Sequence, residues 1–303
     1  MKKQIIILLV LTAFFSCKND IKSDGKLNIV TTTSMITDLV ENIGGDYVNI
    51  QGLMGSGVDP HLYKASEGDV TKLVNANVIF YNGLHLEGKL VEVFEKMGSS
   101  TKTPIALGEE LDKNTLIGSD YFASNYDPHV WFDVSYFIQF AKKVTKVLSE
   151  KDPKNAENFI KNEQQYIAKL EALQMKLEDI IVNLPREKRI LVTAHDAFNY
   201  FGRAYDFDVV GLQGLSTATE AGVKDVQKLS AFIIENKIKA IFVESSVPKR
   251  TIEALQAAVK SKGHEVVIGG TLYSDALGNA GTVEGTYVGM FEYNVNTIVN
   301  ALR

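Results

Sequence analysis

The chain of 303 residues is poor in cysteine, proline and tryptophan, with one Cys, 6 Pro and one Trp. A single cysteine cannot close a disulfide within the chain. Positive charge is not in excess either, because 32 Lys and Arg stand against 37 Asp and Glu, a formal net charge of -5. There is no basic stripe with interleaved aromatic residues. Binding to nucleic acid depends on such a surface, so we exclude DNA and RNA as partners.

The sequence also lacks an apolar run long enough to cross a bilayer. The longest run, residues 5–15, spans about 16 Å as a helix, whereas the hydrocarbon core is about 30 Å thick. Two lysines precede it and Cys17 follows it closely, as in a bacterial lipoprotein signal, although Phe14 stands where leucine is usual. We predict a signal peptide at residues 1–16, lipid on Cys17 and a polar tether at residues 17–26. A cleaved signal with an incidental cysteine is the alternative.

The rest of the chain has the composition of a globular α/β protein, with 45% hydrophobic and 23% charged residues. Short apolar runs rich in β-branched residues alternate with helical stretches, a pattern typical of βα units and parallel sheets. A chain of this length more often forms two cores than one. We therefore predict two α/β lobes, with strands at residues 27–32, 47–53, 76–81, 189–193, 207–212, 240–244 and 265–268.

A long helical segment separates the two groups of strands. Apolar residues recur at three- and four-residue steps from residue 153 to residue 184, and Pro185 ends the pattern. A helix of this length can lie on one lobe or bridge two. The absence of a strict heptad pattern disfavours a coiled-coil dimer. We predict an N-terminal lobe at residues 27–152, a connecting helix at 153–184 and a C-terminal lobe at 185–303.

Three histidines and one aspartate are candidate metal ligands. The tripeptide Asp-Pro-His occurs twice, ending at His61 and at His129, and proline stiffens the loop that carries each imidazole. His195 directly follows a predicted strand, and Asp275 follows another. Open α/β sheets bind ligands at the carboxyl ends of their strands. Three imidazoles and a carboxylate suit a divalent transition metal.

Three further carboxylates are candidates to orient these ligands. Asp59 and Asp127 precede the two prolines, although turn formation explains both equally well. Glu244, at the end of a predicted strand, is a weaker candidate. The other two histidines are not assigned to the site, since we expect His85 to open a helix and His264 to lie in an exposed turn.

Taken together, these motifs resemble a known family. The chain is similar to the metal-binding solute-binding lipoproteins of ABC importers for zinc, manganese or iron, the TroA-like helical backbone metal receptors. The resemblance covers the whole mature chain and rests on Asp59-Pro-His61, Asn82-Gly-Leu-His-Leu-Glu87, Asp127-Pro-His-Val-Trp131, Thr193-Ala-His-Asp-Ala-Phe198, Val243-Glu-Ser-Ser-Val247 and Tyr273-Ser-Asp-Ala-Leu-Gly278. It implies two similar lobes joined by one long helix, with metal bound between them by His61, His129, His195 and Asp275.

The resemblance also implies a function. A receptor of this family is expected outside the cytoplasmic membrane, anchored through lipid on Cys17 and acting as a monomer. It delivers its metal to an ABC permease with its ATPase and is not an enzyme. Family members that favour manganese often carry glutamate at the position of His195, whereas histidine is found in zinc binders and in members that accept both metals. Three nitrogen donors also suit zinc, so we expect Zn²⁺, with Mn²⁺ as the alternative.

Two other functions are compatible with such ligands. Three histidines and a bound water form the catalytic site of many zinc hydrolases, but Asp275 would then fill the position that the water needs. A surface adhesin stabilised by structural metal is the second alternative. Structural zinc sites usually take closely spaced ligands from one small module, whereas these four are far apart in the sequence.

Overall fold

The computed structural model describes residues 25–98, 104–120 and 122–303. The predicted signal peptide, Cys17 and most of the predicted tether lie outside these residues. In the part of the chain that is described, no helix combines the length and the apolar character needed to span a membrane.

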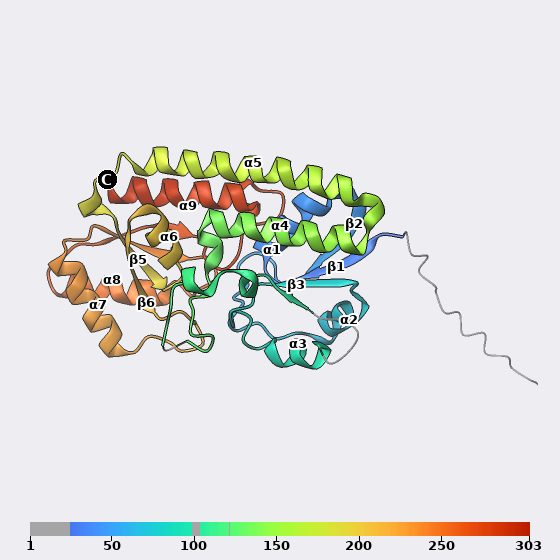
Figure 1. The fold of residues 1–303 in the computed structure, drawn as a ribbon. Coiled ribbons are helices and arrows are strands. Elements are labelled where there is room, and N and C mark those ends of the chain that lie inside the picture. The colour runs from blue at the N-terminus through green and yellow to red at the C-terminus, as the bar shows by residue number, and fades with distance from the viewer. Residues whose placement is uncertain (1–24, 99–103, 121) are drawn as a thin grey trace, which may run out of the picture.

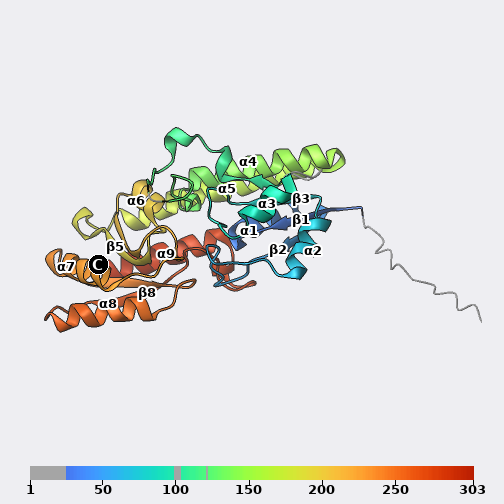
Figure 2. The ribbon, with the colours of Figure 1, turned by 90° about the horizontal axis from the view of Figure 1, so that it is seen from below.

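The N lobe is built on a four-stranded parallel sheet in the order β2-β1-β3-β4. Its strands are β1 (Leu27–Thr31), β2 (Val48–Gly52), β3 (Val78–Tyr81) and β4 (Ile105–Ala106), and its helices are α1 (Ser34–Gly44), α2 (Glu67–Asn75) and α3 (Val91–Gly98). Helices α2 and α3 lie below the sheet in Figure 1 and in front of it in Figure 2. The sequence predicted the first three strands but not β4, which is only two residues long.

The C lobe repeats this arrangement with two parallel strand pairs. Its strands are β5 (Ile190–His195), β6 (Asp208–Gln213), β7 (Ala240–Glu244) and β8 (Val267–Leu272), and its helices are α6 (Asn199–Tyr205), α7 (Val223–Glu235) and α8 (Arg250–Ser261). Strand β5 pairs with β6, β7 pairs with β8, and β5 packs beside β7. The resulting order, β6-β5-β7-β8, matches that of the N lobe, so the predicted α/β fold with two similar lobes is confirmed.

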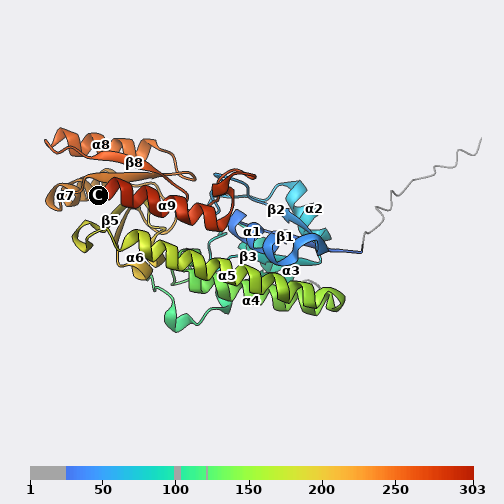
Figure 3. The same ribbon diagram turned by 90° about the horizontal axis from the view of Figure 1, so that it is seen from above.

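Three long helices lie along one side of the molecule. They are α4 (Val134–Lys151), α5 (Ala156–Ile181) and α9 (Tyr287–Leu302). Helix α5 packs against α1, α4 and α9, and Figure 3 shows it passing over both lobes. It lies inside the segment predicted as a connecting helix, whose first residues form a 3₁₀ turn instead. The predicted domain boundaries at residues 152/153 and 184/185 stay a prediction.

Short 3₁₀ turns join several of these elements. They are η1 (Gly45–Tyr47), η2 (Gly108–Glu110), η3 (Lys113–Thr115), η4 (Val130–Phe132), η5 (Pro153–Asn155), η6 (Arg186–Lys188) and η7 (Val283–Gly285). Of these, η4 matters most for the site, because it begins directly after His129.

One hydrophobic core continues through both lobes. It contains Phe80 from the N-lobe sheet, Phe242 from the C-lobe sheet, Leu170 from α5 and Phe291 from α9, all fully buried. Smaller clusters lie under α2 and α3 in the N lobe and under α7 and α8 in the C lobe. Because close-packed interiors resist deformation, a shared core limits how far the lobes move relative to each other.

Asp38 is a buried carboxylate inside this shared core region. Its Oδ2 atom accepts hydrogen bonds from the Tyr166 hydroxyl of α5 at 3.1 Å and from the Tyr287 backbone N–H of α9 at 3.2 Å. It therefore links α1 to α5 and to α9. Burial, which outweighs these hydrogen bonds, raises the pKa of Asp38 from 3.8 to about 6.

This shift predicts a specific pH dependence of stability. The folded protein binds the Asp38 proton more tightly than the unfolded chain, so the contribution is full below about pH 4 and is lost as the pH rises through 6. Ionisation of the carboxyl costs about 3 kcal/mol above that pH. Asp38→Asn removes this term. In urea unfolding of the metal-free protein, the variant should gain stability relative to wild type between pH 4 and pH 7.5, and a constant difference would contradict the assignment.

Candidate metal centre

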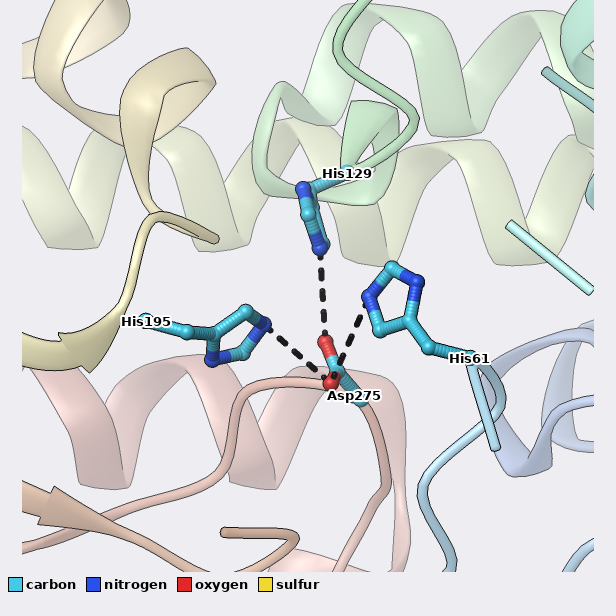
Figure 4. Close-up of side chains that lie close together, drawn as sticks. All are labelled: His61, His129, His195 and Asp275. Carbon is cyan, nitrogen blue, oxygen red and sulfur yellow. Dashed lines mark ion pairs between the residues drawn. The ribbon is translucent and has the colours of Figure 1, made fainter. Parts of the chain in front are cut away.

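Four side chains from four separate segments of the chain converge where the lobes meet. His61 follows β2, His129 precedes η4, His195 is the last residue of β5 and Asp275 follows β8. Figure 4 shows the three imidazoles approaching the Asp275 carboxylate from three sides. One ligand atom from each of the four residues lies within 4.8 Å of every other. The structure therefore brings together all four residues that the sequence singled out.

The spacing of the donor atoms is close to that of a metal site. Asp275 Oδ2 lies 3.2 Å from His195 Nε2 and 4.0 Å from His61 Nε2, and Asp275 Oδ1 lies 3.6 Å from His129 Nε2. Metal–ligand bonds of 2.0–2.1 Å in a tetrahedron place neighbouring donors about 3.3 Å apart. Of these three distances, that to His61 exceeds the tetrahedral spacing most.

The donor atoms are buried and lack other partners. No more than 4% of any of these four residues is exposed. Within the described residues, the Nε2 atoms of His61, His129 and His195 and the Oδ1 atom of Asp275 have no hydrogen-bond partner. An unsatisfied buried polar group costs about 1–3 kcal/mol. A divalent cation at the centre satisfies all four at once, so the donor set fits a transition metal.

The repeated Asp-Pro-His motif forms the same turn at both of its positions. Asp59 Oδ1 accepts a hydrogen bond from the His61 backbone N–H at 2.8 Å, and Asp127 Oδ1 accepts one from the His129 backbone N–H at 2.9 Å. Such Asx turns, stiffened by the intervening proline, fix the direction in which the histidine leaves the backbone. The motif occurs twice because each copy delivers one imidazole.

Two of the three imidazoles are held by a second carboxylate. His129 Nδ1 lies 2.7 Å from Asp127 Oδ1, and His195 Nδ1 lies 2.6 Å from Glu244 Oε2. Glu244 Oε1 also accepts a hydrogen bond from the His195 backbone N–H at 2.8 Å. Carboxylates in this position orient the ring and raise its basicity as a ligand. Asp59, by contrast, contacts the backbone of His61 and not its ring.

Burial and the neighbouring charges shift the pKa values of His61, His195 and Asp275. Burial lowers the pKa of His61 to about 3, so this ring is neutral near pH 7. Burial also disfavours a charge on His195, but Asp275 and Glu244 outweigh it and hold the pKa of His195 well above its ordinary value. Burial opposes ionisation of Asp275, yet His195 and the other imidazoles keep its pKa well below the usual range. His195 and Asp275 therefore each favour the charged form of the other.

The segment that contains Asn82 and Glu87 supports the site in a way that the sequence did not predict. The Asn82 side-chain amide donates to the Pro128 carbonyl at 3.0 Å, and the buried Glu87 carboxylate accepts from the Asn82 backbone N–H at 2.8 Å. His85 does not open a helix, and that prediction was wrong. It lies in a left-handed turn with φ 62°, after Gly83 with φ 78°, and α3 begins only at Val91.

The two-lobed α/β fold, the long helix across both lobes and the buried cluster of three histidines and an aspartate define a metal-binding receptor of the solute-binding type. The chain belongs to the family of the periplasmic zinc-uptake complex component A, ZnuA, whose model matches residues 29–301. The resemblance inferred from the motifs is thereby confirmed.

Similar proteins of known name share nearly the whole length of the chain. The manganese-binding lipoprotein MntA of Bacillus subtilis is 48% identical over 281 residues, which cover 93% of this chain and 91% of that protein. The zinc-binding protein TroA of Treponema pallidum is 48% identical over 301 residues, which cover 98% and 96%. A solved structure of periplasmic TroA from Treponema pallidum matches with a TM-score of 0.89 at 49% identity, covering 92% of this chain and 99% of that chain.

The contact between Glu244 and His195 predicts the effect of a mutation. Glu244→Gln keeps the shape of the side chain but removes the charge that holds His195, so metal affinity should fall about 10- to 100-fold. Glu253→Gln, at an exposed position of α8, is the matched control and should bind like wild type. Competition titration against a chelator measures both. Equal affinities for Glu244→Gln and wild type would show that this carboxylate does not support the ligand.

Proposed function

We propose that this protein captures Zn²⁺ outside the cytoplasmic membrane and delivers it to the permease of an ABC importer, with Mn²⁺ as the alternative cargo. His61, His129, His195 and Asp275 are the proposed ligands. The observation that carries the proposal is the group of four buried donors, all within 4.8 Å of one another and otherwise without partners in the described part of the chain. Relatives named for zinc and for manganese support the choice of cargo.

A receptor fits this site better than a hydrolase does. A catalytic zinc keeps one coordination position open for water and has a base beside it. Here Asp275 occupies the fourth position, and Glu244 is engaged with His195. All four ligands are buried, which favours retention of an ion over turnover of a substrate. A purely structural metal is also disfavoured, because the four ligands come from four separate segments of two lobes.

The geometry suggests how metal is taken up. His61 and His129 come from the first half of the chain, and His195 and Asp275 come from the second. A metal ion bound by all four residues joins the ligands of the two halves. It thereby shifts the protein toward the arrangement in which all four ligands bind it. The size of this shift equals the difference in its binding free energy between the two arrangements. The shared core under α5 restricts the accompanying movement to small tilts of the lobes.

The donor set favours zinc without excluding manganese as cargo. Three imidazole nitrogens suit Zn²⁺, whereas Mn²⁺ prefers shells richer in oxygen. Both oxygens of Asp275 face imidazole nitrogens, so a bidentate carboxylate that suits a larger coordination number is available. His195 is the position at which a change of donor most directly alters this balance.

The location and partners follow from the same proposal. The named relatives include a manganese-binding lipoprotein, which supports lipid attachment through Cys17 and a position on the outer face of the cytoplasmic membrane. The proposed partners are the transmembrane permease and its ATPase. We propose that the receptor acts as a monomer.

The preference for zinc is tested by competition between the two metals. Wild-type protein exposed to equal concentrations of Zn²⁺ and Mn²⁺ should retain zinc, as measured by elemental analysis after removal of free metal. His195→Glu replaces a nitrogen donor with oxygen and should raise the manganese fraction at least about tenfold. His264→Glu adds the same charge away from the site and should leave the ratio unchanged. Retention of neither metal by the wild type would refute the proposed function.

A further inference from the structure

We propose that the four ligands act as three plus one. His129, His195 and Asp275 form one rigid unit, whereas His61 is the ligand that leaves first, and a hydrogen bond from Thr217 to the His61 loop controls its departure. This inference rests on the proposed metal-binding function and adds a positioning residue that does not touch the metal.

The loop that carries His129 is fastened to the C lobe, although it belongs to the first half of the chain. Asn199 Nδ2 of α6 donates to Asp127 Oδ2 at 3.0 Å, and the Tyr200 hydroxyl donates to the Asp127 carbonyl at 3.1 Å. Asp127 in turn holds both the backbone N–H and the ring of His129. Helix α6 begins four residues after His195, so two of the ligands share one support.

The same loop is fastened to the segment that carries Asp275. The Trp131 indole N–H donates to the Ser274 carbonyl at 3.1 Å, and the Tyr287 hydroxyl of α9 donates to the Trp131 carbonyl at 2.6 Å. These groups are fully buried or nearly so. Buried hydrogen bonds of this kind are costly to break, so they keep His129 beside Asp275. Asn82 ties the same loop to the end of β3, so the His129 loop is held from both lobes.

His61 is held more weakly than the other three ligands. Its Nε2 atom lies 4.0 Å from Asp275 Oδ2, whereas His195 Nε2 lies at 3.2 Å. Within the described residues no carboxylate other than Asp275 lies against its ring, so it lacks the support that Asp127 and Glu244 give the other imidazoles. It is also the most exposed of the four ligands, at 4%.

Two hydrogen bonds link helix α1 of the N lobe directly to the segment that follows β8. The Leu277 backbone N–H donates to Ser34 Oγ at 2.8 Å, and the Tyr287 backbone N–H donates to Asp38 at 3.2 Å. Leu277 and Tyr287 belong to the shared core. These links hold the lobes together on the side next to α1 and α9, and neither of them includes the His61 loop.

Thr217 holds this loop from across the site. Its hydroxyl, in the loop between β6 and α7 of the C lobe, donates to Asp59 Oδ2 at 2.5 Å. The other carboxylate oxygen of Asp59 accepts from the His61 backbone N–H. One carboxylate therefore joins the C lobe to the turn that aims His61. Loss of the Thr217 hydrogen bond frees the turn, and His61 with it, while the other three ligands stay in place.

The rate of metal release tests this inference. Zn²⁺-loaded protein is mixed with excess chromophoric chelator, and dissociation is followed by absorbance. Thr217→Val should release zinc about tenfold faster or more, since a hydrogen bond to a charged group is lost. Thr217→Ser keeps the hydroxyl and should restore the wild-type rate. Thr219→Val, at an exposed threonine of the same loop, is the matched control and should release at the wild-type rate.

Two further measurements separate positioning from general destabilisation. The absorption spectrum of bound Co²⁺ should be the same in Thr217→Val and in wild type, because the ligands themselves are unchanged. In a His61→Ala background, Thr217→Val should alter the release rate by less than about twofold, since the ligand through which it acts is gone. If Thr217→Val does not fold, Thr217→Ala answers the same question, because it removes the same hydroxyl donor and leaves Asp59 and its hydrogen bond from the His61 backbone N–H unchanged.

The outcomes distinguish this inference from the proposed function. Wild type that holds zinc tightly, together with Thr217→Val that releases it at the same rate, overturns the three-plus-one site and leaves the proposed function intact. An equal acceleration by Thr217→Val with and without His61 also overturns it. Wild type that binds no zinc overturns both.

Discussion

The rest of the structure depends on holding three imidazoles and one carboxylate around a single buried point. Without a cation, four such donors repel one another or lack hydrogen-bond partners. The site therefore lowers the stability of the metal-free protein. His195 Nε2 and Asp275 Oδ2 lie 3.2 Å apart and attract each other when the ring carries a proton, which reduces this loss of stability. A divalent cation at the centre pairs with all four donors at once.

The fold provides this arrangement by repeating one strand order in two lobes and packing both against the same long helices. Carboxyl ends of parallel strands face the boundary between the lobes, and loops from these ends carry the ligands. The core shared through α5 and α9 holds the two halves together, so that we expect small tilts of the lobes and not separation of whole domains on capture and release.

Much of this was predictable from the sequence, because the signals are local. Apolar runs identified seven of the eight strands, and the proline motifs and strand ends identified His61, His129, His195 and Asp275. Long-range contacts were not predictable. Strand β4 has two residues and no pattern of its own. His85 lies in a left-handed turn beside a buried glutamate. Thr217 bonds to a residue 158 positions away, for which a single sequence offers no signal.

The most direct test is a crystal structure of the zinc-loaded protein with anomalous scattering recorded on both sides of the zinc absorption edge. The account predicts a single strong anomalous peak bonded to His61, His129, His195 and Asp275 at about 2.0–2.2 Å. A peak elsewhere, or a zinc ion that leaves two or more of these side chains uncoordinated, would contradict it.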